Sequence, residues 1–266
     1  MDLKLKGKKA LVTGSSAGLG KSIATMLATE GVTVVVHGRD KERTQKVAKD
    51  IIEAGGLAEV AIGDLTTDEG ADEVAYAALK GGAVDILVNN AGVYHHGGWM
   101  DGTSQTWIDT YNTNVVSGVR MIHRLIPQMR EQKWGRVITI GGGLGIQPIP
   151  LQPDYNATLA ARHNLSVSLA RELKNSGITS NVVSPGAMLT ELTKEFFRKV
   201  APQFGWGNNW DDIERAAVNE FVPNDVGRLG RADEIAAAVL YLASPYADYV
   251  SGAMIRVDGG TIRSVH

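Results

Sequence analysis

The sequence predicts an α/β fold in which helices cover both faces of a doubly wound parallel sheet. Short apolar runs rich in β-branched residues alternate with longer segments of helical periodicity from residue 9 to about residue 183. The apolar runs are almost continuously hydrophobic, which is typical of strands buried on both faces. This alternation indicates repeated strand–helix–strand units. Because 266 residues suffice for one series of strand–helix–strand units with a buried core, we expect a single domain over residues 1–266.

The individual elements follow from the same pattern. We expect strands at residues 10–13, 32–36, 58–62, 86–89, 137–140, 180–183 and 254–257, and helices at 21–30, 43–54, 104–132 and 154–173. The alternation of strands and helices is interrupted at residues 190–228, a segment roughly twice as long as an ordinary helix with its loops. Since this segment is rich in aromatic residues, we expect a lid over the substrate, a helical pair with its own small core, or both.

Composition narrows the classes of partner. The formal net charge is −2 and no basic run is present, so we expect no nucleic-acid partner. We also expect no membrane association and a cytoplasmic location, because the first nine residues lack a signal-like apolar run and no apolar stretch reaches the roughly 18 to 20 residues of a membrane span. The chain has no cysteine and no histidine or carboxylate cluster at ligand spacing, so no metal site is expected. A small-molecule substrate fits this composition best.

A glycine-rich turn follows the first expected strand and begins the first helix. It reads Thr13-Gly14-Ser15-Ser16-Ala17-Gly18-Leu19-Gly20. Glycines at these positions allow a tight turn and the close approach of a pyrophosphate, which the helix N-terminus stabilises. Taken alone, the same residues also fit an ordinary strand-to-helix turn.

The end of the second expected strand reads His37-Gly38-Arg39. A carboxylate there would bind the ribose hydroxyls of NAD and repel a 2′-phosphate, and none is present. The planar guanidinium of Arg39 suits a phosphate. This favours NADP(H) over NAD(H), unless Arg39 only begins a solvated helix end.

Three more motifs follow in order: Asn89-Asn90-Ala91-Gly92, Pro185-Gly186 with Thr190, and Asp258-Gly259-Gly260. Together with the glycine-rich turn they cover essentially the whole chain and resemble the motifs of the classical short-chain dehydrogenase/reductase family. The resemblance implies a Rossmann-type NAD(P)-binding domain. It also implies a set of cofactor-binding residues, namely Gly14, Ser16, Gly18, Leu19, Gly20, Arg39, Asp64, Leu65, Asn90, Ala91, Gly92, Pro185, Gly186 and Thr190.

The segment from residue 140 to residue 159 resembles the active-site segment of that family, in which an asparagine, a serine, a tyrosine and a lysine act together. Asn114 and Tyr155 match the first and third of these, but Gly142 and Leu159 stand where the serine and lysine are expected. Gly142 has no hydroxyl to polarise a carbonyl, and Leu159 has no charge to lower the pKa of the tyrosine. We therefore expect an atypical active site whose tyrosine is a usable acid but a poor base at neutral pH.

Other side chains are candidates to compensate. His95 and His96 follow the Asn-Asn-Ala-Gly motif and could exchange a proton with the substrate, although a role in loop shape alone is the alternative. Arg162 lies two helical turns after Tyr155 and could reach the cofactor or be solvated, and His163 is expected at a helix surface or interface.

These inferences predict an NADP(H)-dependent oxidoreductase that reduces a carbonyl, an imine or an activated alkene of a small molecule. The alternatives are a catalytically impaired NADP(H)-binding protein, and a non-redox lyase or isomerase in which His95 or His96 is the base. The resemblance also implies a homotetramer, or else a dimer, formed through helices 104–132 and 154–173 and the end segment 254–266.

Overall fold

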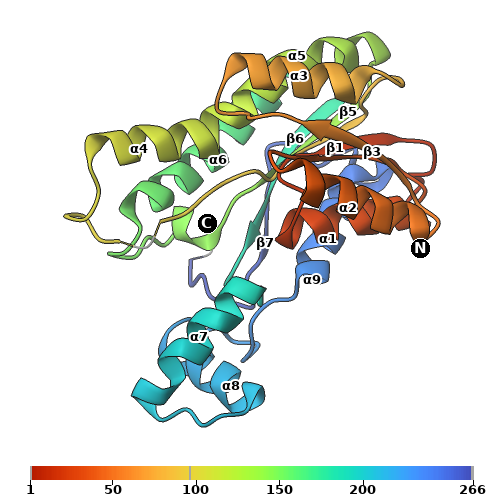
Figure 1. Ribbon diagram of the computed structural model, residues 1–266. Helices are drawn as coiled ribbons and strands as arrows, with labels where there is room; N and C mark the ends of the chain where they lie inside the picture. The colour runs from red at the N-terminus through yellow and green to blue at the C-terminus, as the bar shows by residue number, and fades with distance from the viewer. Residues whose placement is uncertain (1, 96, 265–266) are drawn as a thin grey trace.

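The computed structural model describes residues 2–95 and 97–264 and contains one sheet of seven parallel strands (Figure 1). The strands are β1 Lys9–Val12, β2 Thr33–Gly38, β3 Leu57–Ile62, β4 Ile86–Asn89, β5 Gly135–Ile140, β6 Ile178–Pro185 and β7 Met254–Val257. Their order across the sheet is β3-β2-β1-β4-β5-β6-β7. The order reverses between β1 and β4, and ligands bind at such a switch point, outside the carboxyl ends of the strands.

Helices cover both faces of the sheet, as the sequence predicts. One face packs against α1 Gly18–Thr29, α2 Lys41–Glu53 and α9 Ala232–Ala243, and the other against α3 Asp68–Leu79, α5 Ser117–Gln132 and α6 Pro153–Glu172. Within β1, Ala10 and Val12 join the first of these cores and Leu11 joins the second. The expected α/β fold with a doubly wound parallel sheet is confirmed. No helix in the described part of the chain is long and apolar enough to cross a membrane.

The expected helix at residues 104–132 is interrupted. It consists of α4 Ser104–Tyr111, a π-helical turn at Asn112–Val116, and α5. The wider turn contains Asn114, which is buried and hydrogen-bonds to the backbone of Val93. Isolated π-helical turns occur frequently at functional sites, and hydrophobic periodicity does not predict them. The prediction of one uniform helix was therefore wrong at this turn.

The aromatic segment at residues 190–228 contains a helical pair, α7 Glu191–Phe204 and α8 Trp210–Glu220. Figure 1 shows both helices projecting away from the helices that cover the sheet. They enclose a small hydrophobic core of their own, which includes Phe197, Trp206 and Ile213. The helical pair is confirmed, and its action as a lid stays a prediction.

A buried carboxylate joins this helical pair to the loop that follows it. Glu214 of α8 accepts hydrogen bonds from the Leu229 amide at 3.0 Å, from both terminal nitrogens of Arg231 at 2.7 and 3.1 Å, and from the Trp210 indole at 3.1 Å. These bonds, with the hydrogen bond from Arg231 as the largest contribution, hold the pKa of Glu214 below its usual value despite burial.

We expect Glu214→Ala to lower the free energy of unfolding by about 2 to 3 kcal/mol, because it leaves Arg231 and the Leu229 amide without their buried acceptor. Urea denaturation measures the loss, and limited proteolysis locates it at residues 190–230. Glu195→Ala on the exposed face of α7 is the matched control and should change stability little. Equal effects of the two substitutions would contradict this account.

Candidate active site

An open cleft of about 480 Å³ lies at the carboxyl ends of the strands. Its volume lies within the range of clefts that bind small molecules and cofactors. Among the cofactor-binding residues that the sequence predicts, all except Thr190 line it: Gly14, Ser16, Gly18, Leu19, Gly20, Arg39, Asp64, Leu65, Asn90, Ala91, Gly92, Pro185 and Gly186. Thr190 instead caps the N-terminus of α7, where its hydroxyl accepts the Thr193 amide at 3.1 Å. The contacts of all these residues with a cofactor stay predictions.

The glycine-rich turn has the backbone that a pyrophosphate requires. Gly14 and Gly18 have φ angles of +65° and +54°, a region that favours glycine. A Cβ on Gly20 would lie 2.4 Å from the Gly14 carbonyl oxygen, so no larger residue fits there. Ala17, the N-cap of α1, gives no side-chain hydrogen bond to the first turn. The first amides of α1 therefore have no side-chain cap and suit an anion.

His37 shapes this turn from the neighbouring strand, a role that sequence analysis missed. Its Nδ1 accepts the Gly14 amide at 2.9 Å, and its Nε2 lies 3.2 Å from the Gly63 carbonyl oxygen. Nδ1 must be the acceptor, so the proton is on Nε2. Burial lowers the pKa of His37 to about 4, which keeps the ring neutral at neutral pH. The sequence feature that could have indicated this role is an isolated polar residue within the apolar tip of an expected strand.

Arg39 stands at the tip of β2, on the rim of the cleft. Its Nη1 lies 3.9 Å from Oδ2 of Asp64, and the two side chains are 67% and 44% exposed. A contact this long and this exposed holds the guanidinium weakly. Arg39 is therefore free to rotate toward a phosphate group in the cleft.

Tyr155 lies in the first turn of α6 and lines the same cleft as the glycine-rich turn. Its ring is tilted against the ring of Tyr94, with 5.8 Å between the two centroids. Burial raises the pKa of Tyr155 above its ordinary value, while the nearby charge of Arg162 acts in the opposite direction. The phenol is consequently protonated at neutral pH, as the sequence predicts.

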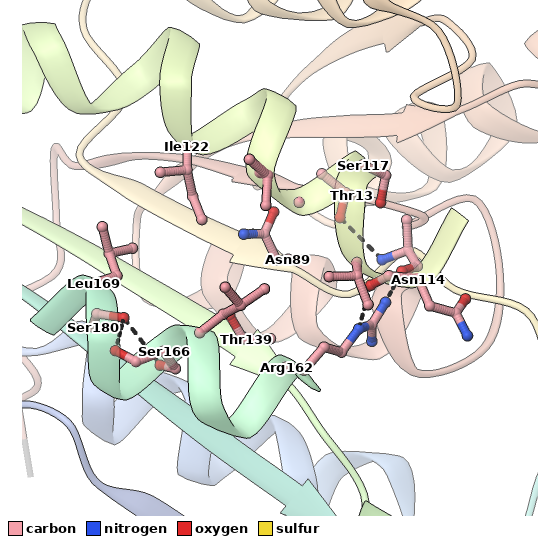
Figure 2. Close-up of a pocket in the computed structure, with 15 residues that line it drawn as sticks. Thr13, Asn89, Asn114, Ser117, Ile122, Thr139, Arg162, Ser166, Leu169 and Ser180 are labelled. Atoms are coloured by element: carbon pink, nitrogen blue, oxygen red, sulfur yellow. Dashed lines mark hydrogen bonds between the residues drawn. The ribbon is translucent and has the colours of Figure 1, made fainter. Parts of the chain in front are cut away.

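Asn114 joins the loop after β4 to α6. Its Oδ1 accepts the Val93 amide at 2.7 Å, and its Nδ2 donates to the Val93 carbonyl at 2.8 Å and to Thr158 Oγ1 at 3.0 Å. Asn114 is not among the residues that line the cleft, and it lines a small neighbouring cavity of about 30 Å³ whose lining residues Figure 2 shows. Its side chain thus holds the backbone of Val93 in place.

Gly142 and Leu159, which stand where the resemblance implies a serine and a lysine, are packed closely together. A Cβ on Gly142 would lie 2.9 Å from Cδ1 of Leu159, whose side chain is buried. A serine at position 142 therefore requires Leu159 to move. The residues at these two positions are therefore coupled through packing.

Arg162 is buried and His163 is half-buried. Arg162 is only 8% exposed, so a solvated position was wrong. Its guanidinium donates to the carbonyl oxygens of Asn114, Ile140 and Ala91. His163 packs against the loop after β5, where a Cβ on Gly141 would lie 2.4 Å from its Nε2 and only glycine leaves room. Its expected position at a helix surface or interface stays a prediction.

The two histidines proposed as alternative proton carriers have separate outcomes. His96 lies outside the described residues. The Nδ1 atom of His95 lies 3.4 Å from Thr110 Oγ1 and 3.9 Å from Oδ2 of the buried Asp154. His95 lines a smaller, separate pocket of about 60 Å³ and is not among the residues around the main cleft. Its catalytic role stays a prediction.

Across residues 2–95 and 97–264, no group of three or more histidine, aspartate or glutamate side chains is arranged to hold a metal ion. The side chains that line the cleft include the Tyr155 phenol and the Arg162 guanidinium.

Comparisons with known proteins agree with this geometry. A family model described as short chain dehydrogenase matches residues 8–201. The chain is 37% identical to the uncharacterized oxidoreductase YvaG of Bacillus subtilis, over the full length of both. It is 35% identical to the 3-oxoacyl-[acyl-carrier-protein] reductase FabG of Escherichia coli, covering 97% of this chain and 98% of the relative.

Two solved structures are similar over nearly the whole chain. L-sorbose reductase from Gluconobacter frateurii, complexed with NADPH and L-sorbose, has a TM-score of 0.93 at 31% identity, with both chains fully covered. A 3-oxoacyl (acyl-carrier-protein) reductase from Agrobacterium tumefaciens with NADP bound has a TM-score of 0.86 at 34% identity, covering 97% of this chain and 95% of that one.

The neutral state of His37 predicts how stability depends on pH. The pKa is about 4 in the folded protein and about 6.5 in the unfolded chain, so the unfolded chain binds more protons between these values. Stability should therefore fall as the pH falls from about 6.5 to about 4, by at most about 3 kcal/mol from this residue. Urea denaturation at both ends of this pH range should show a smaller loss of unfolding free energy in His37→Gln than in the unsubstituted protein. The exposed His123→Gln is the control, and an unchanged acid slope in His37→Gln would contradict the prediction.

Proposed function

Because the chain belongs to the short chain dehydrogenase family, we propose that it is an NADP(H)-dependent reductase that converts a carbonyl group of a small molecule to an alcohol. Imines and activated alkenes would be reduced by the same chemistry. One observation carries the proposal: the Tyr155 phenol lines the same cleft as the glycine-rich turn and Arg39. The structures of similar reductases with NADPH or NADP bound support the choice of cofactor.

Each part of the cleft has a role in this reaction. The uncapped amides of α1 would hold the pyrophosphate, and Arg39 would hold the 2′-phosphate. A reduced nicotinamide, when bound, supplies the hydride that adds to the carbonyl carbon as the C=O π bond breaks. Tyr155 donates its proton to the oxygen and becomes a phenolate, which regains a proton from water. The product is an alcohol, and Tyr155 is restored.

The direction of the reaction follows from the proton on Tyr155. Reduction needs the phenol, which burial favours, whereas alcohol oxidation needs the phenolate, which burial disfavours. Gly142 supplies no hydroxyl to the carbonyl oxygen, so Tyr155 is the one donor that we assign to that oxygen. The enzyme should therefore act as a reductase at neutral pH.

The two other functions make different predictions. A catalytically impaired NADP(H)-binding protein would bind the reduced cofactor but never consume it. A lyase or isomerase that uses His95 or His96 would convert its substrate without any change in cofactor absorbance. Following NADPH absorbance with a panel of carbonyl compounds separates the reductase from both, and a ketose and a 3-oxoacyl thioester are the first members because similar proteins are named for them.

We also propose that the enzyme is a homotetramer, with a dimer as the alternative. Ile108 and Tyr111 of α4 and Leu165 of α6 are large, exposed and apolar, which supports an assembly through these helices. Light scattering measures the mass and decides between the two states.

Replacing Tyr155 by phenylalanine tests the proposed acid. The phenylalanine ring keeps the packing of the tyrosine ring but has no hydroxyl proton to donate. The rate of carbonyl reduction should therefore fall by about 10²- to 10⁴-fold at neutral pH. The remote and exposed Tyr241→Phe is the control and should retain full activity.

In the unsubstituted enzyme the rate of alcohol oxidation should rise about tenfold per pH unit between about pH 7 and pH 9, because the phenolate fraction rises in that proportion below the pKa. An oxidation rate that is flat over this range would show that Tyr155 is not the base.

Arg39 should determine the preference between the two cofactors. We expect Arg39→Ala to weaken NADPH binding by about 10- to 100-fold through the loss of a charge-assisted hydrogen bond, and to leave NADH binding nearly unchanged. Fluorescence titration of each reduced cofactor measures the two dissociation constants. Arg43→Ala, which removes an equally exposed cation one helical turn away, is the control. Equal losses for NADPH and NADH would exclude a contact with the 2′-phosphate.

A further inference from the structure

Arg162 forms part of the wall between the cleft and the small cavity behind it. The side chain comes from α6, two turns after Tyr155, and lines both spaces. Figure 2 shows its guanidinium reaching toward Asn114, with hydrogen bonds drawn to the residues around it. The group is thus buried inside the protein and still borders the cleft where the reaction is proposed to occur.

Three backbone carbonyls hold the guanidinium. Its Nε donates to the Asn114 oxygen at 2.5 Å, its Nη1 to the Ile140 oxygen at 2.7 Å, and its Nη2 to the Ala91 oxygen. These carbonyls come from the π-helical turn, the end of β5 and the loop after β4. A guanidinium has five N–H groups, so two remain beyond these bonds. Nη2 lies 3.0 Å from the position of a Cβ on Gly92, a residue that lines the cleft.

The guanidinium keeps its charge despite burial. Burial lowers the pKa of Arg162 to about 10, which still leaves the group protonated at neutral pH by roughly a thousandfold. The neighbour that raises its pKa again is Tyr155. Burying a cation among neutral carbonyls costs several kcal/mol, and a cation beside a phenol stabilises the phenolate form.

Position 162 lies one helical turn beyond position 159, on the same face of α6. Position 159 holds Leu159, which packs against Gly142 and has no charge. We propose that Arg162 is a positioning residue that supplies, from one turn further along α6, the positive charge that position 159 lacks, and so stabilises the phenolate that Tyr155 becomes on giving up its proton. This inference rests on the proposed function of Tyr155 as the acid.

Other ionisable groups around Tyr155 do not provide this charge. Tyr94, from the loop after β4, raises the pKa of Tyr155. His163 has its own pKa lowered by burial and by Arg162, so it is neutral at neutral pH. Asp154, the preceding residue, is an acid whose carboxylate accepts a hydrogen bond from Thr110. Arg162 is the cation that acts on the phenol from within α6.

The experiment measures the titration of one phenol in the full-length protein. A 3-fluorotyrosine placed at position 155 titrates at lower pH than tyrosine, and its ¹⁹F resonance reports its charge with and without NADPH. We expect Arg162→Gln to raise the titration midpoint by about one pH unit or more, because the cation that favours the phenolate is lost. Arg171→Gln, an exposed arginine at the end of the same helix, is the control and should leave the midpoint unchanged.

Lysine substitutions separate charge from structure. In Leu159→Lys/Arg162→Gln the midpoint should return toward that of the unsubstituted protein, although the three carbonyl hydrogen bonds of Arg162 are still missing. Because a lysine at position 159 favours the phenolate in any case, Arg162→Lys is the deciding comparison: it keeps a charge at position 162 without the planar guanidinium that makes the three carbonyl hydrogen bonds. A midpoint near that of the unsubstituted protein assigns the effect to charge, and a midpoint as high as in Arg162→Gln assigns it to structure. Arg162→Met, with and without Leu159→Lys, repeats the comparison if the glutamine variant does not fold, because methionine adapts to irregular space.

An unchanged midpoint in the folded Arg162→Gln or Arg162→Met protein would overturn the inference, and so would a raised midpoint that Leu159→Lys leaves unaltered. The titration needs no substrate, so its outcome is measured separately from that of the activity assay. If no carbonyl compound is reduced but the midpoints behave as expected, the proposed reaction fails, whereas the effect of Arg162 on the Tyr155 phenolate stands. If reduction occurs and the midpoints do not move, the proposed reaction stands and the role of Arg162 fails.

Discussion

The close approach of α6 to the loop after β5 is the constraint on which the candidate active site depends. A Cβ on Gly145 would lie 2.8 Å from the Leu159 carbonyl carbon, and one on Gly141 would lie 2.4 Å from the His163 ring. The glycines therefore let the helix backbone rest almost directly on the loop. This contact sets the distance between Tyr155, near the start of α6, and the strand ends where a cofactor would lie. A larger residue at either glycine would move the acid away from its substrate.

Polar contacts then fasten the helix in that position. Asn114 connects the loop after β4 to Thr158 of α6, and Arg162 connects α6 to three separate backbone segments. Because these groups are buried, each bond that is lost would leave an unpaired polar atom at a cost of about 1 to 3 kcal/mol. The wall of the cleft is consequently held by several interactions that depend on one another, and it should be among the least mobile parts of the molecule.

Two opposing effects set the acidity of Tyr155, and their relative size decides the chemistry. Burial is the larger effect and favours the phenol, and the charge of Arg162 is the smaller one and favours the phenolate. The result is a group that holds its proton at neutral pH but can release it to a forming alkoxide. The pair of Gly142 and Leu159 fits this balance, since the apolar contact between them adds to the dry surroundings of the phenol without adding a second charge.

The sequence by itself determined the positions of all seven strands, the glycine-rich turn and Tyr155, because hydrophobic periodicity and short motifs are properties of neighbouring residues. It could not determine the π-helical turn at Asn114, the role of His37 or the burial of Arg162. Each of these depends on contacts between residues far apart in the chain: Asn114 bonds to Val93, His37 bonds to Gly14, and Arg162 bonds to Ala91. Tertiary structure alone decided that the chain keeps a buried cation near Tyr155, since only folding brings three carbonyls from separate segments around one side chain.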